Sequence, residues 1–156
     1  MPADPDLHVV LVAPEIPPNT GTTARLCAAT DTRLHLVGPL GFSLEDRYLR
    51  RAGLDYWPHV DLEMHADWTS FSARHRCAPL RLFSARAERS FTRARYQRGD
   101  FLVFGGETRG LDPALLAEHA DSTYTIPMTS RSVRSLNLAN AAAIVLYEAL
   151  RQLGRT

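Results

Sequence analysis

The stretch Phe101-Leu-Val-Phe-Gly-Gly-Glu-Thr-Arg-Gly110 indicates how this chain folds. Four apolar residues end at two glycines, and a third glycine follows after three polar residues. A short apolar run bounded by turn residues is typical of a buried parallel strand. Glycines let the following backbone turn sharply or approach a ligand. Because open α/β sheets bind ligands beyond the carboxyl ends of their strands, this loop is either a binding site or a tight strand-to-helix connection.

Working outward from this strand, alternating strand and helix patterns predict one α/β domain over residues 1–156, with a parallel sheet covered on both faces. Strands are expected at 8–13, 34–37, 55–61, 80–84, 101–104 and 123–126. Helices are expected at 22–30, 43–52, 67–75, from 112 onward and at 137–153. Asn19 is the predicted N-cap of the first helix, because the prolines before it argue against helix. Residues 1–7 are expected to form a loose N-terminal tail.

The last predicted helix is apolar on nearly every side between Leu138 and Leu150. A helix of this kind is buried on more than one side. Because it ends the chain of a small domain, we expect it to form the interface of a homodimer.

Composition indicates an ordinary globular protein, with 45% hydrophobic and 22% charged residues. The formal net charge of +1 excludes a bulk polycation that binds nucleic acid without specificity. All 18 basic residues are arginine, and there is no lysine. Biased codon usage and selection for phosphate contacts both fit this bias, since arginine forks suit phosphates.

Several classes of site and location are disfavoured by the sequence. Cys27 and Cys77 form no disulfide framework, and the acidic start lacks the features of a signal peptide, so we expect a cytoplasmic protein without membrane segments. Glu107 breaks the G-x-G-x-x-G pattern, and no lysine is present for a G-x-x-x-x-G-K-[ST] loop. The six histidines lack zinc-type spacing, so structural or surface roles and no bound metal are expected.

Three polar clusters lie at strand or helix ends. The first is Asn19 to Arg25, which also fits a capped helix with one solvated arginine. The second is the loop Gly105 to Gly110. The third is Arg134 to Asn140, which also fits a serine cap followed by core leucines, although its two asparagines need hydrogen-bond partners if buried.

These clusters carry a resemblance. Pro14-Glu-Ile-Pro-Pro-Asn-Thr-Gly21 with Arg25, Phe104-Gly-x-Glu-Thr-Arg-Gly110, and Ile126-Pro-Met128 with Arg134-Ser-Leu-Asn-Leu-x-Asn140 are similar to the three motifs of the SPOUT RNA methyltransferases. The nearest resemblance is to the TrmL-like tRNA (cytidine/uridine-34)-2′-O-methyltransferases, and it runs from about residue 8 to 154. It implies a parallel-sheet α/β knot, with a deep trefoil knot in the C-terminal part, and a dimer packed partly through the last helix.

The resemblance also implies a cofactor, S-adenosylmethionine, held among the knot loops near Ala85, Gly105, Gly110, Ile126 and Ser135. The reaction implied is attack of a ribose 2′-hydroxyl on the activated methyl group. In the family the catalytic part falls on Arg25, with polar support from Asn19, Ser135 and Asn137. Arginine is a poor base because its pKa exceeds about 12, so we interpret Arg25 as orienting the hydroxyl or a phosphate, with a role as base left open.

The tRNA anticodon loop is the expected partner, with Glu107, Arg109 and Arg134 as substrate contacts. Arg86, Arg89, Arg93, Arg95 and Arg98, interleaved with Phe91 and Tyr96, are candidates for phosphate binding and base stacking. A solvated basic loop explains them equally well, and Arg47, Arg50 and Arg51 form a second candidate patch. Ribosomal RNA as substrate, or an RNA-binding protein without activity, are the alternatives.

Four features depart from the family pattern. Ala13 stands where close relatives often have glutamate, Ala85 replaces a larger apolar residue, and Gly106 replaces a usual proline. The segment between Met128 and Ser135 is one residue longer than usual. None of these changes removes a residue assigned to catalysis.

Overall fold

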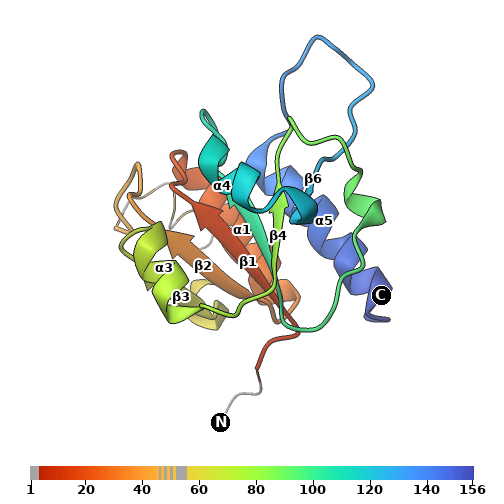
Figure 1. Cartoon of the computed structure of the whole chain (residues 1–156). Helices are drawn as coiled ribbons and strands as arrows, with labels where there is room; N and C mark the ends of the chain where they lie inside the picture. The colour runs from red at the N-terminus through yellow and green to blue at the C-terminus, as the bar shows by residue number, and fades with distance from the viewer. Residues whose placement is uncertain (1–3, 46, 48, 50, 52–55) are drawn as a thin grey trace.

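Six parallel strands form one sheet in the order β3-β2-β1-β5-β4-β6 (Figure 1). The structure is a computed structural model that describes residues 4–45, 47, 49, 51 and 56–156. The strands are β1 (Leu7–Val12), β2 (Arg33–Val37), β3 (Leu62–His65), β4 (Leu80–Phe83), β5 (Asp100–Gly105) and β6 (Thr123–Tyr124). The order reverses between β1 and β5, which is the position where open α/β sheets bind ligands.

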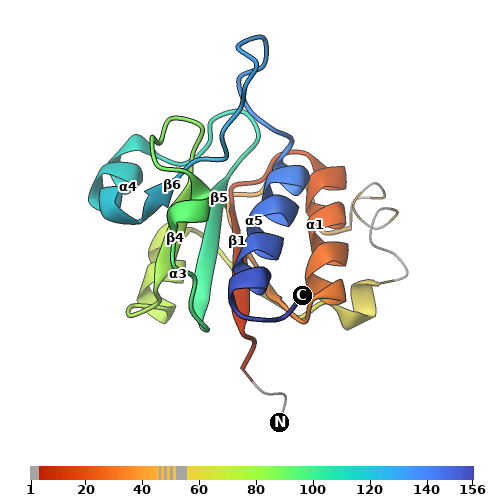
Figure 2. The same ribbon diagram turned by 90° about the vertical axis from the view of Figure 1, so that its right-hand side faces the viewer.

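Helices cover both faces of the sheet, as the sequence predicts. Helices α1 (Pro17–Ala29) and α5 (Leu138–Gln152) lie side by side on one face, and α3 (Trp68–Arg74) and α4 (Pro113–Glu118) lie on the other (Figure 2). Short 3₁₀ turns, η1 (Trp57–His59), η2 (Phe91–Arg93) and η3 (Ala120–Ser122), connect these elements. No helix among the described residues is both long and apolar enough to cross a membrane.

Each face has its own apolar core, because strand side chains alternate between the two faces. Leu11, Leu36 and Leu102 point toward α1 and α5, where they meet Ala142 and Leu146. On the other face the buried side chains are fewer and pack around Phe71 of α3 and Leu115 of α4; they include Val10, Val37, Leu82 and Val103. Phe101 and Val103 are buried, so the strand that opened the sequence analysis is confirmed at the centre of the sheet.

The predicted start of the first helix is wrong. Helix α1 begins at Pro17 with Ile16 as its N-cap, so Asn19 lies inside the first turn and is not the cap. The prolines do not prevent this, because the first N–H groups of a helix have no partner within the helix and proline lacks only that group. The prediction treated Pro17 and Pro18 as helix breakers when they occupy the positions that tolerate them.

The third predicted strand is also misplaced. Residues 57–59 form the 3₁₀ turn η1, and the strand begins later, at Leu62. Hydrophobic patterns do not detect this strand well, because β3 buries His65 and partly buries Glu63, which are both polar. Of the predicted helix over 43–52, residues 43–45 are not helical and residues 47, 49 and 51 are; the other four positions lie outside the described residues.

The N-terminal tail is shorter than expected. Leu7 begins β1 and is buried, and Asp6 forms ion pairs with Arg98 and Arg155. The backbone carbonyl of Asp6 also accepts a hydrogen bond from the Gly99 amide at 2.7 Å. The chain is therefore anchored from Asp6 onward, and residues 1–3 lie outside the described residues.

The two cysteines differ in accessibility, which gives a direct test of the fold. Cys27 is fully buried in α1, where burial raises the pKa of its thiol, whereas Cys77 is exposed. Since the thiolate is the reactive species, we expect one thiol per chain to react rapidly with Ellman's reagent in native buffer, and two in denaturant. Cys77→Ser should abolish the rapid phase, and two rapid thiols in the native wild type would contradict the packing of α1.

Candidate active site

A cavity of about 700 Å³ lies at the carboxyl ends of β4, β5 and β6, a volume typical of small-molecule sites. Four loops form it, at 84–86, 105–110, 125–128 and 134–138, together with two residues of the α1 region, Ile16 and Asn19. In Figure 2 these loops gather above the upper ends of α5 and α1. Loop segments up to about 50 residues apart in sequence therefore enclose one cavity. It lies at the carboxyl ends of the strands, where the sequence analysis expected a binding site.

The glycine loop is both a cavity wall and a close backbone crossing. A Cβ atom on Gly105 would lie 2.1 Å from the carbonyl carbon of Gly110, so a side chain cannot fit there. The Gly110 amide donates to the Gly106 carbonyl at 2.9 Å, and Gly110 has a φ of +67°. Gly106 faces the Ala13 carbonyl, 2.5 Å from where its Cβ would lie. The loop therefore fits both interpretations from the sequence: it lines the cavity, and it makes a tight turn after β5.

Glu107 connects this loop to the N-terminus of α1. Its carboxylate accepts hydrogen bonds from the backbone N–H of Glu15, at 3.0 and 3.1 Å, and of Ile16, at 2.6 Å. In return, Thr108 Oγ1 donates to the Glu15 carboxylate at 2.6 Å. Ile16 has no capping side chain of its own, so Glu107 supplies the cap from a distant part of the sequence. Glu107 was predicted to contact substrate; it lines the cavity, but both carboxylate oxygens are engaged by the backbone.

The two asparagines predicted to support catalysis meet at the cavity. Asn137 Nδ2 donates to Asn19 Oδ1 at 2.9 Å, across 118 positions of sequence. Asn137 Oδ1 accepts from the Asn140 amide at 3.1 Å, so Asn137 is also the N-cap of α5. This pair joins the starts of the two helices that cover one face of the sheet. Asn137 and Asn140 are both exposed, so neither is the buried asparagine that would need a partner for stability.

The structure brings most of the predicted site residues to the cavity and leaves two outside it. Those that line it are Asn19, Ala85, Arg86, Gly105, Glu107, Arg109, Gly110, Ile126, Arg134, Ser135 and Asn137. Arg25 lies on the exposed side of α1, with its guanidinium 4.5 Å from the ring centroid of Tyr56. Arg89 donates to the carbonyls of Ala120 and Asp121 and lies over the Tyr124 ring, away from the cavity.

One part of the proposed RNA surface is wrong. Tyr96 is buried, with 5% of its surface exposed, and its hydroxyl donates to the Phe91 carbonyl at 2.7 Å. The Tyr96 ring therefore presents no free face for base stacking as predicted, whereas Phe91 packs against the core and is only partly buried. Arg93 and Arg95 are exposed, Arg98 pairs with Asp6, and Arg50 lies outside the described residues.

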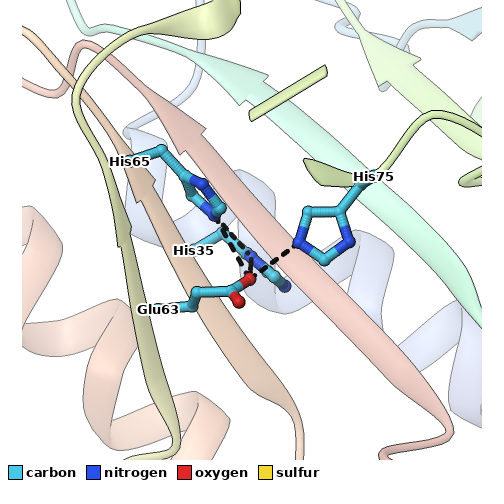
Figure 3. A group of neighbouring side chains, drawn as sticks. All are labelled: His35, Glu63, His65 and His75. Carbon is cyan, nitrogen blue, oxygen red and sulfur yellow. Dashed lines mark hydrogen bonds and ion pairs between the residues drawn. The ribbon is translucent and has the colours of Figure 1, made fainter. Parts of the chain in front are cut away.

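A second group of polar side chains lies on the face of the sheet that α3 covers. The spacing of these residues along the chain did not indicate it. We call it the histidine–glutamate cluster; it consists of His35, Glu63, His65 and His75 (Figure 3). His35 and Glu63 are paired in register on β2 and β3, and His65 follows two residues later on the same face. His75 is the C-cap of α3. Only the strand pairing and the docking of α3 bring these positions together.

Burial favours neutral rings in this cluster. It lowers the pKa of His35 to about 3 and that of the neighbouring His8 to about 4, and it also lowers the pKa of His65. For Glu63, burial acts in the opposite direction, but the hydrogen bond with His75 and the charges of its neighbours hold the carboxyl pKa below its ordinary value. The cluster therefore combines one carboxylate with two buried imidazoles, those of His35 and His65, whose lowered pKa values favour the neutral ring.

Comparison with known proteins assigns the class. Residues 6–147 match the model of the SpoU rRNA Methylase family, and the chain belongs to this family. Among its relatives is a Burkholderia pseudomallei protein named tRNA (cytidine(34)-2′-O)-methyltransferase, 49% identical over 150 residues, which cover 94% of this chain and 96% of the relative.

Solved structures agree with this assignment. A structure concerned with 2-OH methylation of C/U34 on tRNA has a TM-score of 0.91 and 50% identity, covering 96% of this chain and 97% of that one. The SpoU methyltransferase AviRb from Streptomyces viridochromogenes, in complex with the cofactor AdoMet, has a TM-score of 0.83 and 25% identity. That match covers 97% of this chain and 60% of the AviRb chain. The parallel α/β sheet and its cavity are thus those of a methyltransferase.

The Glu107 contacts predict a measurable loss of stability on substitution. Glu107→Gln keeps the shape of the side chain but replaces an accepting oxygen by an NH₂ group that faces backbone N–H donors. We expect the free energy of unfolding, measured by urea denaturation, to fall by about 1–3 kcal/mol. The matched control is Glu118→Gln on exposed α4, expected within about 0.5 kcal/mol of wild type. Equal midpoints for both variants would contradict the capping role.

Proposed function

We propose that this chain methylates the ribose 2′-hydroxyl of the wobble nucleotide, cytidine or uridine 34, of tRNA. The observation that carries the proposal is the Asn19–Asn137 hydrogen bond beside Ser135 at the cavity, because it places two converging amides where a ribose can be oriented. The relative from Burkholderia pseudomallei, 49% identical along nearly the whole chain, is named for this reaction on cytidine.

The cavity suits S-adenosylmethionine, which the AviRb structure contains as AdoMet. Apolar side chains of Phe104, Ile126 and Leu138 can cover an adenine ring, and the backbone of the glycine loop can meet polar groups. Ala85, Gly105, Gly110, Ile126 and Ser135 are the residues we assign to holding the cofactor. When bound, the cofactor supplies a methyl group already activated by the sulfonium charge.

The residues of the chain then have two tasks, alignment of the ribose hydroxyl and help with its proton. Alignment alone accounts for several kcal/mol of a bimolecular barrier, about 7–11 in well-oriented systems. Asn19 and Asn137 hold each other in place, and Ser135 adjoins them with a hydroxyl that can donate or accept. We assign these three side chains to orientation of the ribose.

Arg25 has a different position and so a different task. Its guanidinium lies on the exposed side of α1 and outside the cavity, stacked on Tyr56. From there it can bind a phosphate or orient a hydroxyl of RNA that rests over the protein, and its permanent positive charge suits both. Arg86, Arg109 and Arg134, exposed around the cavity, provide further phosphate contacts, and Arg89 follows Arg86 in the chain but lies outside the cavity.

The outer face of α5 supports a homodimer. Ile144 and Tyr147 are 39% and 50% exposed, and they form one apolar patch on the side of α5 that points away from the sheet. We propose that these large exposed side chains on one helix form an interaction surface. We further propose that the loops around the cavity form the trefoil knot of the family, supported by the way the separate loops at 84–86, 105–110, 125–128 and 134–138 enclose one cavity.

Methyl transfer from labelled S-adenosylmethionine to unmodified tRNA tests the proposed reaction. We expect a 2′-O-methyl group at nucleotide 34, mapped by nuclease digestion and mass spectrometry. Arg25→Ala and Asn19→Ala should each lower the rate roughly 100-fold or more, since each removes an orienting contact. Arg76→Ala, at an exposed arginine away from the cavity, is the matched control and should keep the wild-type rate.

Two outcomes would redirect the proposal. Transfer to ribosomal RNA but not to tRNA would assign the same chemistry to the other substrate class, in line with the name of the family. Cofactor binding without transfer to either RNA would contradict an enzymatic function.

The dimer surface has its own test. Ile144→Glu places a carboxylate on the apolar patch, where burial against a second copy would be costly. We expect the wild type to show twice the 17.4 kDa chain mass by light scattering and the variant to show the chain mass alone. Val133→Glu, at an exposed loop position, is the control. A variant that remains dimeric would exclude this face of α5 as the interface.

A further inference from the structure

The four ligand-type atoms of the histidine–glutamate cluster converge on a single point. Nδ1 of His35 and Nε2 of His75 each lie 2.8 Å from Oε2 of Glu63, and Nε2 of His65 lies 3.2 Å from it. Nδ1 of His35 is also 3.2 Å from Nε2 of His65, and all four atoms lie within 4.8 Å of one another. Figure 3 shows the three rings directed at the carboxylate from β2, β3 and the end of α3.

Two of these separations, both 3.2 Å, are close to those of a tetrahedral metal site, and the two of 2.8 Å are hydrogen-bond distances that would lengthen on metal binding. Zn²⁺ binds imidazole nitrogen at about 2.0–2.1 Å, which places neighbouring ligand atoms about 3.3 Å apart. Imidazole nitrogen and carboxylate oxygen are both ligand types that Zn²⁺ accepts, and three nitrogens with one oxygen give the four-coordination of structural zinc sites. We propose that the histidine–glutamate cluster binds one Zn²⁺ ion, as a structural site that joins β2, β3 and α3.

The surrounding residues orient the proposed ligands. The remaining ring nitrogen of His35, Nε2, lies 2.9 Å from Nδ1 of His8, so a proton on Nε2 can be donated to His8 while Nδ1 keeps its lone pair for the metal. Metal-binding histidines usually have such a partner for the other nitrogen. His8 is itself held by stacking on Phe101, with ring centroids 3.9 Å apart.

The carboxylate and the rings are held in a similar way. Arg74 Nε lies 2.9 Å from Oε1 of Glu63, which leaves Oε2 directed at the three histidines. Phe71 packs edge-on against His35 and His65, with centroids 5.8 and 5.1 Å away, and this limits ring rotation. The His35 and His65 side chains are 0% and 3% exposed, but Glu63 and His75 are 16% and 19% exposed, so an ion can reach the site from their side.

The position of the cluster indicates a structural and not a catalytic role. None of its four residues lines the cavity at the carboxyl ends of β4, β5 and β6. Strand β3 is a short edge strand of four residues with β2 as its one neighbour in the sheet. A metal bridge would bind this edge to α3 and make its stability depend on the ion, because binding to the folded state stabilises that state.

The test uses the untagged, full-length protein, stripped with a chelator and then titrated with Zn²⁺ or Co²⁺. We expect one ion per chain by mass spectrometry of the metal content, and a tetrahedral Co²⁺ absorption spectrum. At a free zinc concentration near 100 times the Kd, the Tm should rise by roughly 5–10 °C.

His75→Gln and Glu63→Gln change partly exposed ligands, and circular dichroism shows whether each variant folds. Each should weaken zinc binding at least 10-fold and abolish the rise in Tm. His59→Gln, at an exposed histidine outside the cluster, should bind zinc like the wild type. No equimolar binding, an octahedral Co²⁺ spectrum, or folded ligand variants that bind zinc as tightly as the wild type would each overturn the proposal.

Discussion

The contact on which the site depends is the Glu107 carboxylate at the N-terminus of α1. Two backbone N–H groups, of Glu15 and Ile16, point at it, and the positive end of the helix dipole adds to the attraction. The carboxylate belongs to the loop after β5, and the helix follows β1. This one ion–amide contact therefore joins the two loops that flank the point where the strand order reverses.

Several features of the cavity follow from that junction. With α1 started at Pro17, Asn19 lies in the first turn of the helix, in reach of Asn137 at the start of α5. The Asn19–Asn137 bond then aligns the N-termini of two helices on the same sheet face, beside the glycine loop. The crowded crossing at Gly105 leaves no volume for a side chain, so backbone and not side chain forms that wall of the cavity. A site built from helix starts and backbone is stiff, which suits a reaction that depends on alignment.

The two faces of the sheet differ in the kind of side chain that they bury. The face under α1 and α5 is apolar and supports the cavity and the proposed dimer surface, whereas the face under α3 contains buried histidines beside its aliphatic side chains. Buried polar groups reduce stability unless they are paired, and here each is paired within the histidine–glutamate cluster or with His8. A zinc ion would supply the stability that a smaller apolar core on this side lacks.

The sequence alone determined the class of fold, the central strands and most cavity residues, because apolar runs and glycine loops report local backbone requirements. It identified Asn19 and Asn137 separately, although it took the first for a helix cap. Three features became clear only from the folded chain. The two amides form a hydrogen bond with each other, and Glu107 caps a helix about 90 residues away in the chain. Tyr96 is buried. The histidines of the histidine–glutamate cluster could not be recognised as one group from the sequence, because they too meet only in the tertiary structure. Their side chains meet because of the register between β2 and β3 and the docking of α3, and neither can be read from the spacing of residues along the chain.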